Sequence, residues 1–303
     1  MKNTNSLYEE HAHIYYHLAN DRQFDIETLE ISKLSPDKSG SFVELFAGPA
    51  YHSLEAESLG IFNDVIAIDS SDRMKNISSV YGYNSTYIVN DCTKALEELL
   101  NISVAIIPRF SICLIDPQSV DLLFNALSKS MMKDGIIAIE LHNNIDIEQN
   151  LENISIKERN FFVGKEKFTC KWPKSILSTN NELGVNNLSI EVEIRSTDTH
   201  ITSISNEYLY DIKFVEEKLE TIGFILDKTS DIKTPSGTFN VFRNKESLFN
   251  DKESVTYMDN MVSRSLSEIF TLDNDSAKTH ISRSGLDIEK HHTTLTSHVY
   301  NLL

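Results

Sequence analysis

Between residues 42 and 140, short apolar runs alternate with helix-like stretches, and this alternation constrains the fold more than any other feature. Short, mostly apolar runs suit strands that are buried on both faces. Strands that alternate with helices predict a parallel sheet with right-handed crossovers. The predicted strands are 42–46, 65–68, 86–89, 112–115 and 136–139, and the predicted helices are 53–59, 70–79, 93–107 and 118–132.

Beyond residue 140, polar and apolar residues alternate, as is typical of antiparallel strands, and 189–195 has a clear period of two. A helix over 208–221, followed by strands at 224–226 and 238–242, would complete the first sheet with an antiparallel pair. The chain is therefore expected to form a three-layer α/β sandwich. Its sheet would be mostly parallel and seven-stranded with an antiparallel final strand, accompanied by N-terminal helices and a small antiparallel insertion at about 143–205.

Three segments follow from this pattern. Residues 1–39 form a helical segment, in which Asp21 is expected to cap the second helix. This segment is rich in tyrosine and histidine, so it forms either packed helices or a lid that brings aromatic side chains to a substrate. Residues 40–245 form the main domain, and 246–303 form a helical or flexible extension.

Composition excludes several classes of function. The 303 residues carry a formal net charge of −17, whereas nucleic acid requires basic surfaces, so no nucleic-acid partner is expected. No stretch has the pattern of a signal peptide or a membrane span, and the three cysteines are too far apart for a zinc site or disulfide framework. These features predict a cytoplasmic protein without a metal or a membrane partner. His291, His292 and His298 share a short segment, but no cluster of acids or cysteines accompanies them.

Acidic residues stand at or near the ends of the predicted strands. Glu44 lies within the first, and the later ones are followed or ended by Asp69, Asp91, Asp116 and Glu140. Parallel strands bring their carboxyl ends to one edge of the sheet, where open α/β folds bind ligands. Isolated buried acids are costly, so these positions predict a binding site. A carboxylate after the second strand suits a ribose diol.

The ordered set of motifs resembles class I S-adenosylmethionine-dependent methyltransferases, with a Rossmann-like domain over about 40–245. The parts that resemble successive family motifs are 44–53, 68–74, 90–92, 110–116, 134–140 and 208–224, in that order. The family usually has glycine where this chain has Phe46 and Ala50, but Gly48 is retained. A nicotinamide-binding loop would need two further glycines after the first strand.

The resemblance implies S-adenosylmethionine as cofactor and a role for each matching residue. Near the methionine part, Glu44 would organise the loop and help to hold the amino group, and the loop itself would consist of Ala47, Gly48, Pro49 and Ala50. Asp116 would lie near the same end of the cofactor, or at the entrance to the substrate pocket.

The adenosine part would lie along the next two motifs. The resemblance implies that Asp69, with Ser70 beside it, binds the ribose hydroxyls and that Met74 packs near the adenine. Asp91 would accept a hydrogen bond from the adenine amino group, and the backbone amide of Cys92 would face a ring nitrogen.

Structural roles remain open for several of these residues. Asp69 and Asp116 can each cap a helix, and Asp91 can be a turn residue. Glu44 can stabilise the fold by accepting hydrogen bonds from loop amides, and Cys92 can be a small packed residue.

Methyl transfer from a sulfonium is an in-line displacement, so the protein mainly supplies proximity and alignment. A general base is needed only for a protonated acceptor. His142, just past the fifth strand, is the first candidate, with a surface-loop histidine as the alternative. Tyr15 and Tyr16 are weaker candidates, and Trp172 is a candidate pocket residue from the insertion.

The expected function is methyl transfer to a small molecule or a peptide-type natural product. A non-catalytic S-adenosylmethionine-binding regulatory protein and a protein methyltransferase are the alternatives. The sequence predicts neither the acceptor atom nor the oligomeric state.

Overall fold

The structure is a computed structural model that describes residues 2–3, 5–142, 158–235 and 237–245. The expected extension at 246–303, with His291, His292 and His298, and the first part of the insertion lie outside the described residues. Among the residues that are described, no helix is long and apolar enough to cross a membrane.

A mostly parallel sheet forms the centre of the described chain, as the alternation predicts. Its seven-strand path runs β11-β13-β6-β5-β2-β3-β4, and the short β12 pairs with β13 beside this path. Strands β2 to β6 pair in parallel, whereas β13 is antiparallel to both β6 and β11. The bounds are β2 (Ser41–Leu45), β3 (Asp64–Asp69), β4 (Thr86–Val89), β5 (Ile102–Ile107), β6 (Met131–His142), β11 (Phe224–Leu226), β12 (Ile232–Lys233) and β13 (Gly237–Asn244).

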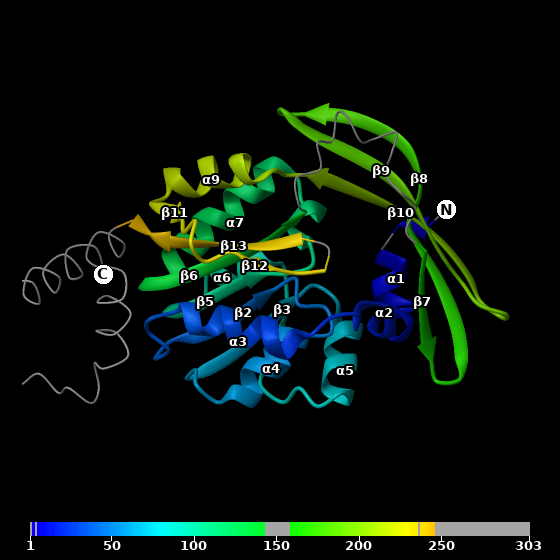
Figure 1. Cartoon of the computed structure of the whole chain (residues 1–303), viewed down its shortest axis with the longest axis horizontal. Helices are drawn as coiled ribbons and strands as arrows, with labels where there is room; N and C mark the ends of the chain where they lie inside the picture. The colour runs from blue at the N-terminus through cyan, green and yellow to red at the C-terminus, as the bar shows by residue number, and fades with distance from the viewer. Residues whose placement is uncertain (1, 4, 143–157, 236, 246–303) are drawn as a thin grey trace, which may run out of the picture. The chain divides into compact units, whose positions relative to one another are not determined.

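Helices cover both faces of this sheet, which confirms the three-layer sandwich (Figure 1). One face packs against α3 (Phe24–Leu34), α4 (Tyr51–Leu59) and α5 (Asp72–Val80), and the other against α6 (Cys92–Leu96), α7 (Pro117–Ser130) and α9 (Ile212–Thr221). Successive strand residues point to opposite faces. In β3, for example, Ile66 and Ile68 join the core under α7, whereas Val65 and Ala67 join the core under α4.

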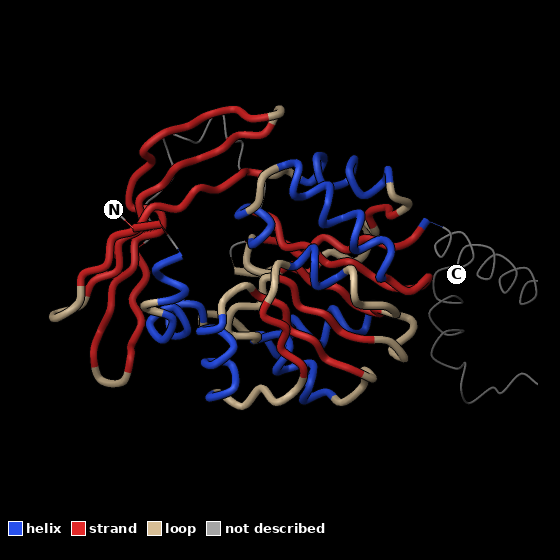
Figure 2. The backbone as a smooth tube through the Cα atoms, turned by 180° about the vertical axis from the view of Figure 1, so that it is seen from behind, coloured by secondary structure: helices blue, strands red, loops and turns tan. Residues whose placement is uncertain are grey.

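The insertion is a second, antiparallel sheet of long strands (Figure 2). It consists of β7 (Glu158–Val163), β8 (Glu166–Glu182), β9 (Val185–Arg195) and β10 (His200–Leu209), and the N-terminal β1 (Lys2–Asn3) adds to β10 in parallel. Helices α1 (Asn5–Glu9) and α2 (Ala12–Ala19) bury Leu7, Ile14 and Leu18 against this sheet. The last insertion strand extends to Leu209, so the next helix begins at Ile212 rather than at 208.

The predicted helix over 93–107 and the predicted strand over 112–115 are wrong. The helix ends at Leu96, the fourth parallel strand is β5, and Ser111–Leu114 form the 3₁₀ turn η1. Phe110 adopts a left-handed backbone conformation (φ 59°), which interrupts the extended chain before the apolar run at 112–115. Ile112 and Cys113 lie on this turn and are buried in the core, so this apolar run packs into the core without forming a strand.

Two smaller expectations also fail. The helix α3 is preceded by Gln23 at its N-cap, so Asp21 does not cap it, and its carboxylate binds arginines instead. The strand β6 begins at Met131 and contains Gly135, which is therefore not a turn after the preceding helix. A Cβ on Gly135 would lie 2.7 Å from the Ile102 carbonyl oxygen, so a close approach of two strands requires this glycine.

Gly40, directly before β2, provides a test of this packing. A Cβ there would lie 2.0 Å from the Asn101 carbonyl oxygen, and a backbone atom cannot move aside as a flexible side chain can. We expect Gly40→Ala to lower the free energy of unfolding by about 3 kcal/mol in urea denaturation. Gly164→Ala is the control, because nothing lies within 4 Å of its Cβ position, so only its left-handed backbone (φ 61°) should cost energy, about 1–2 kcal/mol. Equal losses in the two variants would contradict this account.

Candidate functional site

The loop between β2 and α4 has an unusual backbone. Phe46 (φ 52°), Gly48 (φ 49°) and Ala50 (φ 60°) all lie in the left-handed region, where residues other than glycine pay about 1–2 kcal/mol. Phe46 and Ala50 are the positions where the resembling family usually has glycine, the residue that adopts this conformation most readily. Backbone strain of this kind clusters at functional sites, which makes the loop a candidate site.

Asp69, at the carboxyl end of β3, closes this loop. Its Oδ2 accepts from the Gly48 amide at 2.8 Å, and its Oδ1 accepts from the Ser71 amide at 2.9 Å. Burial raises the pKa of Asp69, although these two amide hydrogen bonds oppose the shift. The Tyr87 hydroxyl donates to the Gly48 carbonyl oxygen at 2.6 Å, so the turn is held from the β4 side as well. Ser71, and not Asp69, is the N-cap of α5.

Glu44 is buried in β2 beneath the loop. Its Oε2 accepts from both the amide and the hydroxyl of Ser53 at 2.7 Å, so Glu44 anchors the first turn of α4. Its Oε1 lies 3.4 Å from Nδ1 of His52. These contacts join Glu44 to α4, while its expected roles in organising the loop and in holding a cofactor amino group stay predictions.

A chain of buried charged residues continues from Glu44. His52 Nε2 lies 3.1 Å from Glu27 on α3, and Glu27 lies 3.6 Å from Arg22 Nη1. The same nitrogen donates to both carboxylate oxygens of Glu140 on β6, at 2.7 and 2.9 Å. Each of these side chains is at most 7% exposed. The chain therefore ties the end of β2 to the end of β6 through the N-terminal segment.

A second strained loop follows β5. Arg109 (φ 55°) and Phe110 (φ 59°) are both left-handed, and the Arg109 amide donates to Glu140 Oε2 at 2.5 Å. The Arg109 side chain donates to Asp21 Oδ1 and to the Ala19 carbonyl oxygen, both at 2.8 Å. The buried ion-pair chain thus also positions this loop.

His142 ends β6, and its ring stacks on Phe110 with centroids 3.7 Å apart. A Cβ on Gly237 would lie 2.5 Å from the Phe110 ring, so this stack requires glycine on the neighbouring β13. Burial lowers the pKa of His142 to about 4, although Glu140 opposes the shift. The imidazole is therefore neutral at physiological pH.

Of the two expected tyrosines, Tyr15 is at the loop and Tyr16 is not. A Tyr15 ring carbon lies 3.9 Å from where a Cβ on Gly48 would be. Tyr16 instead stacks on Tyr81 at 3.6 Å and packs against Tyr51, in an aromatic cluster between α2, α4 and α5. Tyr8 from α1 contacts the Tyr15 ring edge-on at 4.8 Å, and its carbonyl oxygen accepts from the Ser71 hydroxyl.

The adenosine-side residues lie on the elements expected for them. Ser70 is exposed after β3, and Met74 is buried in the core under α5. Asp91 is the exposed N-cap of α6, with its carboxylate accepting from the Lys94 amide. Cys92 is buried, its Sγ accepts from the Phe46 amide at 3.4 Å, and burial raises its pKa to about 12, so it is a packed thiol and not a nucleophile.

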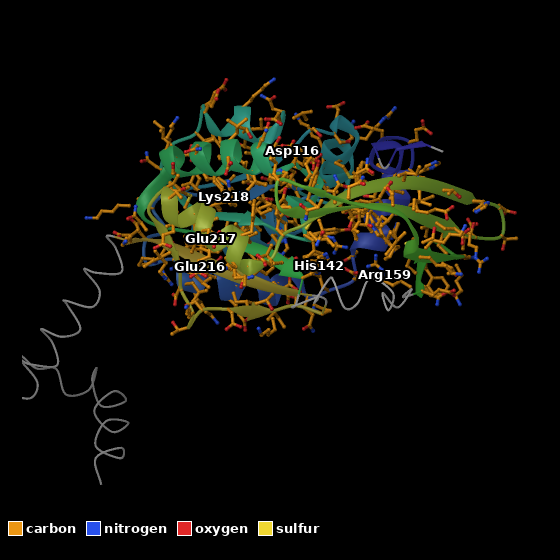
Figure 3. All side chains as sticks on the ribbon, turned by 90° about the horizontal axis from the view of Figure 1, so that it is seen from above. Asp116, His142, Arg159, Glu216, Glu217 and Lys218 are labelled. Carbon is orange, nitrogen blue, oxygen red and sulfur yellow. The ribbon has the colours of Figure 1, made fainter. Side chains whose placement is uncertain are left out.

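Asp116 is not at a strand end, because the strand expected before it is the turn η1. It is the N-cap of α7 and accepts from the Gln118 and Ser119 amides. Figure 3 shows Asp116 well apart from His142, so the two do not form one catalytic group.

Sequence reasoning missed several residues that the fold brings to this edge. Arg22, Glu27, His52 and Arg109 come from separate elements, and their pairing depends on contacts between residues up to 118 positions apart. Tyr8 carried a weak signal as one of several N-terminal tyrosines, but nothing in the sequence distinguished it from its neighbours.

The His52 bridge predicts how stability depends on pH. Burial alone would lower the pKa of His52, but Glu27 and Glu44 raise it above its ordinary value. The folded protein then binds more protons than the unfolded chain, so this contribution is complete below about pH 6.5 and is lost as pH rises through the folded pKa. The stability advantage of the wild type over His52→Gln should therefore shrink above about pH 6.5, by at most about 1.4 kcal/mol per pH unit.

Urea unfolding between about pH 6 and pH 9 measures this difference. His13→Gln is the control, because His13 is exposed on α2 and is not part of the bridge. A difference that stays constant with pH for His52→Gln would show that the bridge does not depend on a protonated imidazole.

Known proteins resemble this chain in structure and not in sequence. No protein-family model matches the sequence, and no curated protein is similar to it in sequence. Solved structures do match. An S-adenosylmethionine-dependent methyltransferase from Clostridium acetobutylicum has a TM-score of 0.55 at 13% identity, over 78% of this chain and 98% of that chain.

Two further structures are similar to this chain. The sugar N-methyltransferase KedS8 from Streptoalloteichus has a TM-score of 0.57 at 11% identity, over 76% of this chain and 92% of that chain. S-adenosylmethionine-bound CalS10, an amino pentose methyltransferase from Micromonospora echinaspora, has a TM-score of 0.55 at 9% identity, over 74% and 93%. The described part of this chain therefore has the fold of the class I S-adenosylmethionine-dependent methyltransferases.

Proposed function

We propose that this protein binds S-adenosylmethionine at the β2 and β3 ends and transfers its methyl group to a small-molecule acceptor. The observation that carries the proposal is the hydrogen bond from the Gly48 amide to Asp69. It joins a left-handed loop and a half-buried carboxylate at adjacent carboxyl ends of a parallel sheet. Open α/β folds bind their ligands at this edge.

The residues at this edge fit the cofactor chemically. Asp69 uses each carboxylate oxygen once, and a carboxylate has about four lone-pair sites, so it retains acceptor capacity for ribose hydroxyls. Gly48 suits its left-handed backbone (φ 49°), and its Cβ position lies in ordinary contact with the Tyr15 ring, at 3.9 Å. Asp91 and the start of α6 would face the adenine, with Ser70 and Met74 beside the ribose and ring.

The bound cofactor would supply an activated methyl group. The protein's own contribution is then orientation: the buried chain from Glu44 to Glu140 would hold the two strained loops at a fixed spacing, and Tyr15 would shield the site from water. Small displacements of aligned groups cost rate steeply, so such rigidity suits an in-line transfer.

The two named sugar and amino pentose methyltransferases support a small polar acceptor, and the net charge of −17 argues against nucleic acid. A regulatory protein that only binds the cofactor would show tight binding with no transfer to any acceptor. A protein methyltransferase would label macromolecules in a lysate, whereas the proposed enzyme would label low-molecular-weight compounds.

Calorimetry with S-adenosylmethionine tests the cofactor site. Asp69→Asn removes the charge that strengthens its hydrogen bonds to ribose, and such bonds contribute about 1.5–3 kcal/mol, so affinity should fall about 10- to 100-fold. Asp64→Asn is the matched control, because Asp64 is exposed at the opposite end of the same strand. Unchanged affinity in Asp69→Asn would remove the ribose assignment.

His142 is proposed as a neutral hydrogen-bond acceptor for the methyl acceptor. His142→Phe keeps a ring on Phe110 but removes both nitrogens, so turnover should fall at least about tenfold while cofactor affinity stays within about twofold. Because the pKa of His142 is about 4, its titration should not reduce the wild-type rate between about pH 5.5 and pH 8. Unchanged turnover in His142→Phe would exclude this role.

A further inference from the structure

The strand β10 presents polar side chains on the face that the insertion turns toward the N-terminal helices. Ser203, Ser205 and Glu207 alternate along this face after Ile201, which packs against Leu7. On the neighbouring β9, the residues opposite the two serines are the buried Val192 and Ile190. A polar stripe thus lies beside an apolar surface.

The two serines are buried without partners. Ser203 is 1% exposed and Ser205 is fully buried, and neither hydroxyl has a hydrogen-bond partner among the described residues. Buried hydroxyls normally find a partner, since leaving one unpaired costs about 1–3 kcal/mol. Unpaired hydroxyls beside a carboxylate are what a site for a polar ligand would contain.

Glu207 is held by Trp172, which reaches it across β9 from β8. The indole Nε1 donates to Glu207 Oε1 at 2.9 Å, and no second hydrogen bond to this carboxylate exists among the described residues. Burial raises the pKa of Glu207. The hydrogen bond from Trp172 lowers this pKa, and so does the nearby Ser205 hydroxyl, although its position does not meet the geometry of a hydrogen bond. One carboxylate oxygen therefore remains available beside an aromatic ring.

The charge of Glu207 acts on two neighbouring elements, α1 and the turn η1. Burial raises the pKa of Tyr8 on α1, with smaller contributions from Tyr15 and Glu207, and burial followed by Glu207 raises the pKa of Cys113 in η1. Tyr8 is in turn influenced by Asp69 and Arg109, so it lies within electrostatic reach of both sites. The Arg109 charge is paired with Asp21, whereas no ion pair among the described residues neutralises Glu207.

We propose that Glu207, with Trp172 beside it and Ser203 and Ser205 along the same strand, binds an amine-bearing acceptor and takes the proton from its nitrogen. A carboxylate with a free oxygen suits a protonated amine, through a charge-assisted hydrogen bond. This inference rests on the proposed methyl transfer for its chemistry, but not for the binding site itself.

The step balances. The ammonium group of the acceptor gives one proton to the Glu207 carboxylate, which leaves a nitrogen lone pair. That pair forms the bond to the methyl carbon as the carbon–sulfur bond breaks and its electrons stay on sulfur. The products are a methylated ammonium group, the neutral thioether form of the cofactor and a protonated Glu207, which returns its proton to solvent.

Trp172 is the only tryptophan in the chain, so its fluorescence reports on this site without cofactor or turnover. The probe is D-glucosamine, and N-acetyl-D-glucosamine, which lacks the cationic nitrogen, is its control. We expect a saturable change of Trp172 emission with glucosamine only. In Glu207→Gln, which keeps an acceptor for the indole, the affinity should be at least about tenfold weaker.

Glu191→Gln is the control variant, because Glu191 is on the same sheet between the inward-facing Ile190 and Val192 and binds Lys174. It should titrate as the wild type does. No response of the wild type to glucosamine, an equal response to the acetylated sugar, or an unchanged affinity in Glu207→Gln would each overturn the proposal. Calorimetry with S-adenosylmethionine on Glu207→Gln should give wild-type affinity, so failure of cofactor binding in the wild type would count against the proposed function and not against this site.

Discussion

A buried ion pair between Arg22 and Glu140 holds together the edge of the sheet on which the proposed site lies. Arg22 comes from the segment before α3, and Glu140 from the end of β6, so the pair joins parts of the chain that no regular hydrogen-bond ladder connects. Breaking a buried pair leaves an uncompensated charge and costs about 3–5 kcal/mol. The other side chains in this series of buried charges, from Glu44 to Arg109, depend on the neutralisation of Arg22 by Glu140.

This arrangement explains how two strained loops can persist side by side. Left-handed residues other than glycine are kept only where the surroundings over-determine them. Phe46 and Ala50 are held by the hydrogen bond of Asp69 to the middle of their loop and by that of Glu44 to the first turn of α4. Arg109 and Phe110 are held by Glu140 and by the His142 stack. The same contacts that stabilise the fold therefore shape the candidate site. The burial of a residue alone does not tell a stabilising role from a role in the site.

The central α/β pattern could be predicted because strand and helix periodicities are local properties. Residues 65–68 and 86–89 are short apolar runs with turns on both sides, and they form β3 and β4. The run at 112–115 has the same local character, yet it forms a turn, because 102–107 already occupies the place between β2 and β6. Two apolar runs competed for one strand position, and only pairing with the neighbouring strands could decide between them.

The sequence by itself determined the class of fold and the position of Asp69, since a strand, a tight loop and a helix with an acid after the next strand are set by local pattern. Tertiary structure alone decided the roles of Asp21, Asp116 and Tyr16, and it alone assembled Arg22, His52, Glu140 and the Trp172–Glu207 pair. The physical reason is that charge pairing and burial depend on contacts across more than a hundred residues, which no local periodicity encodes.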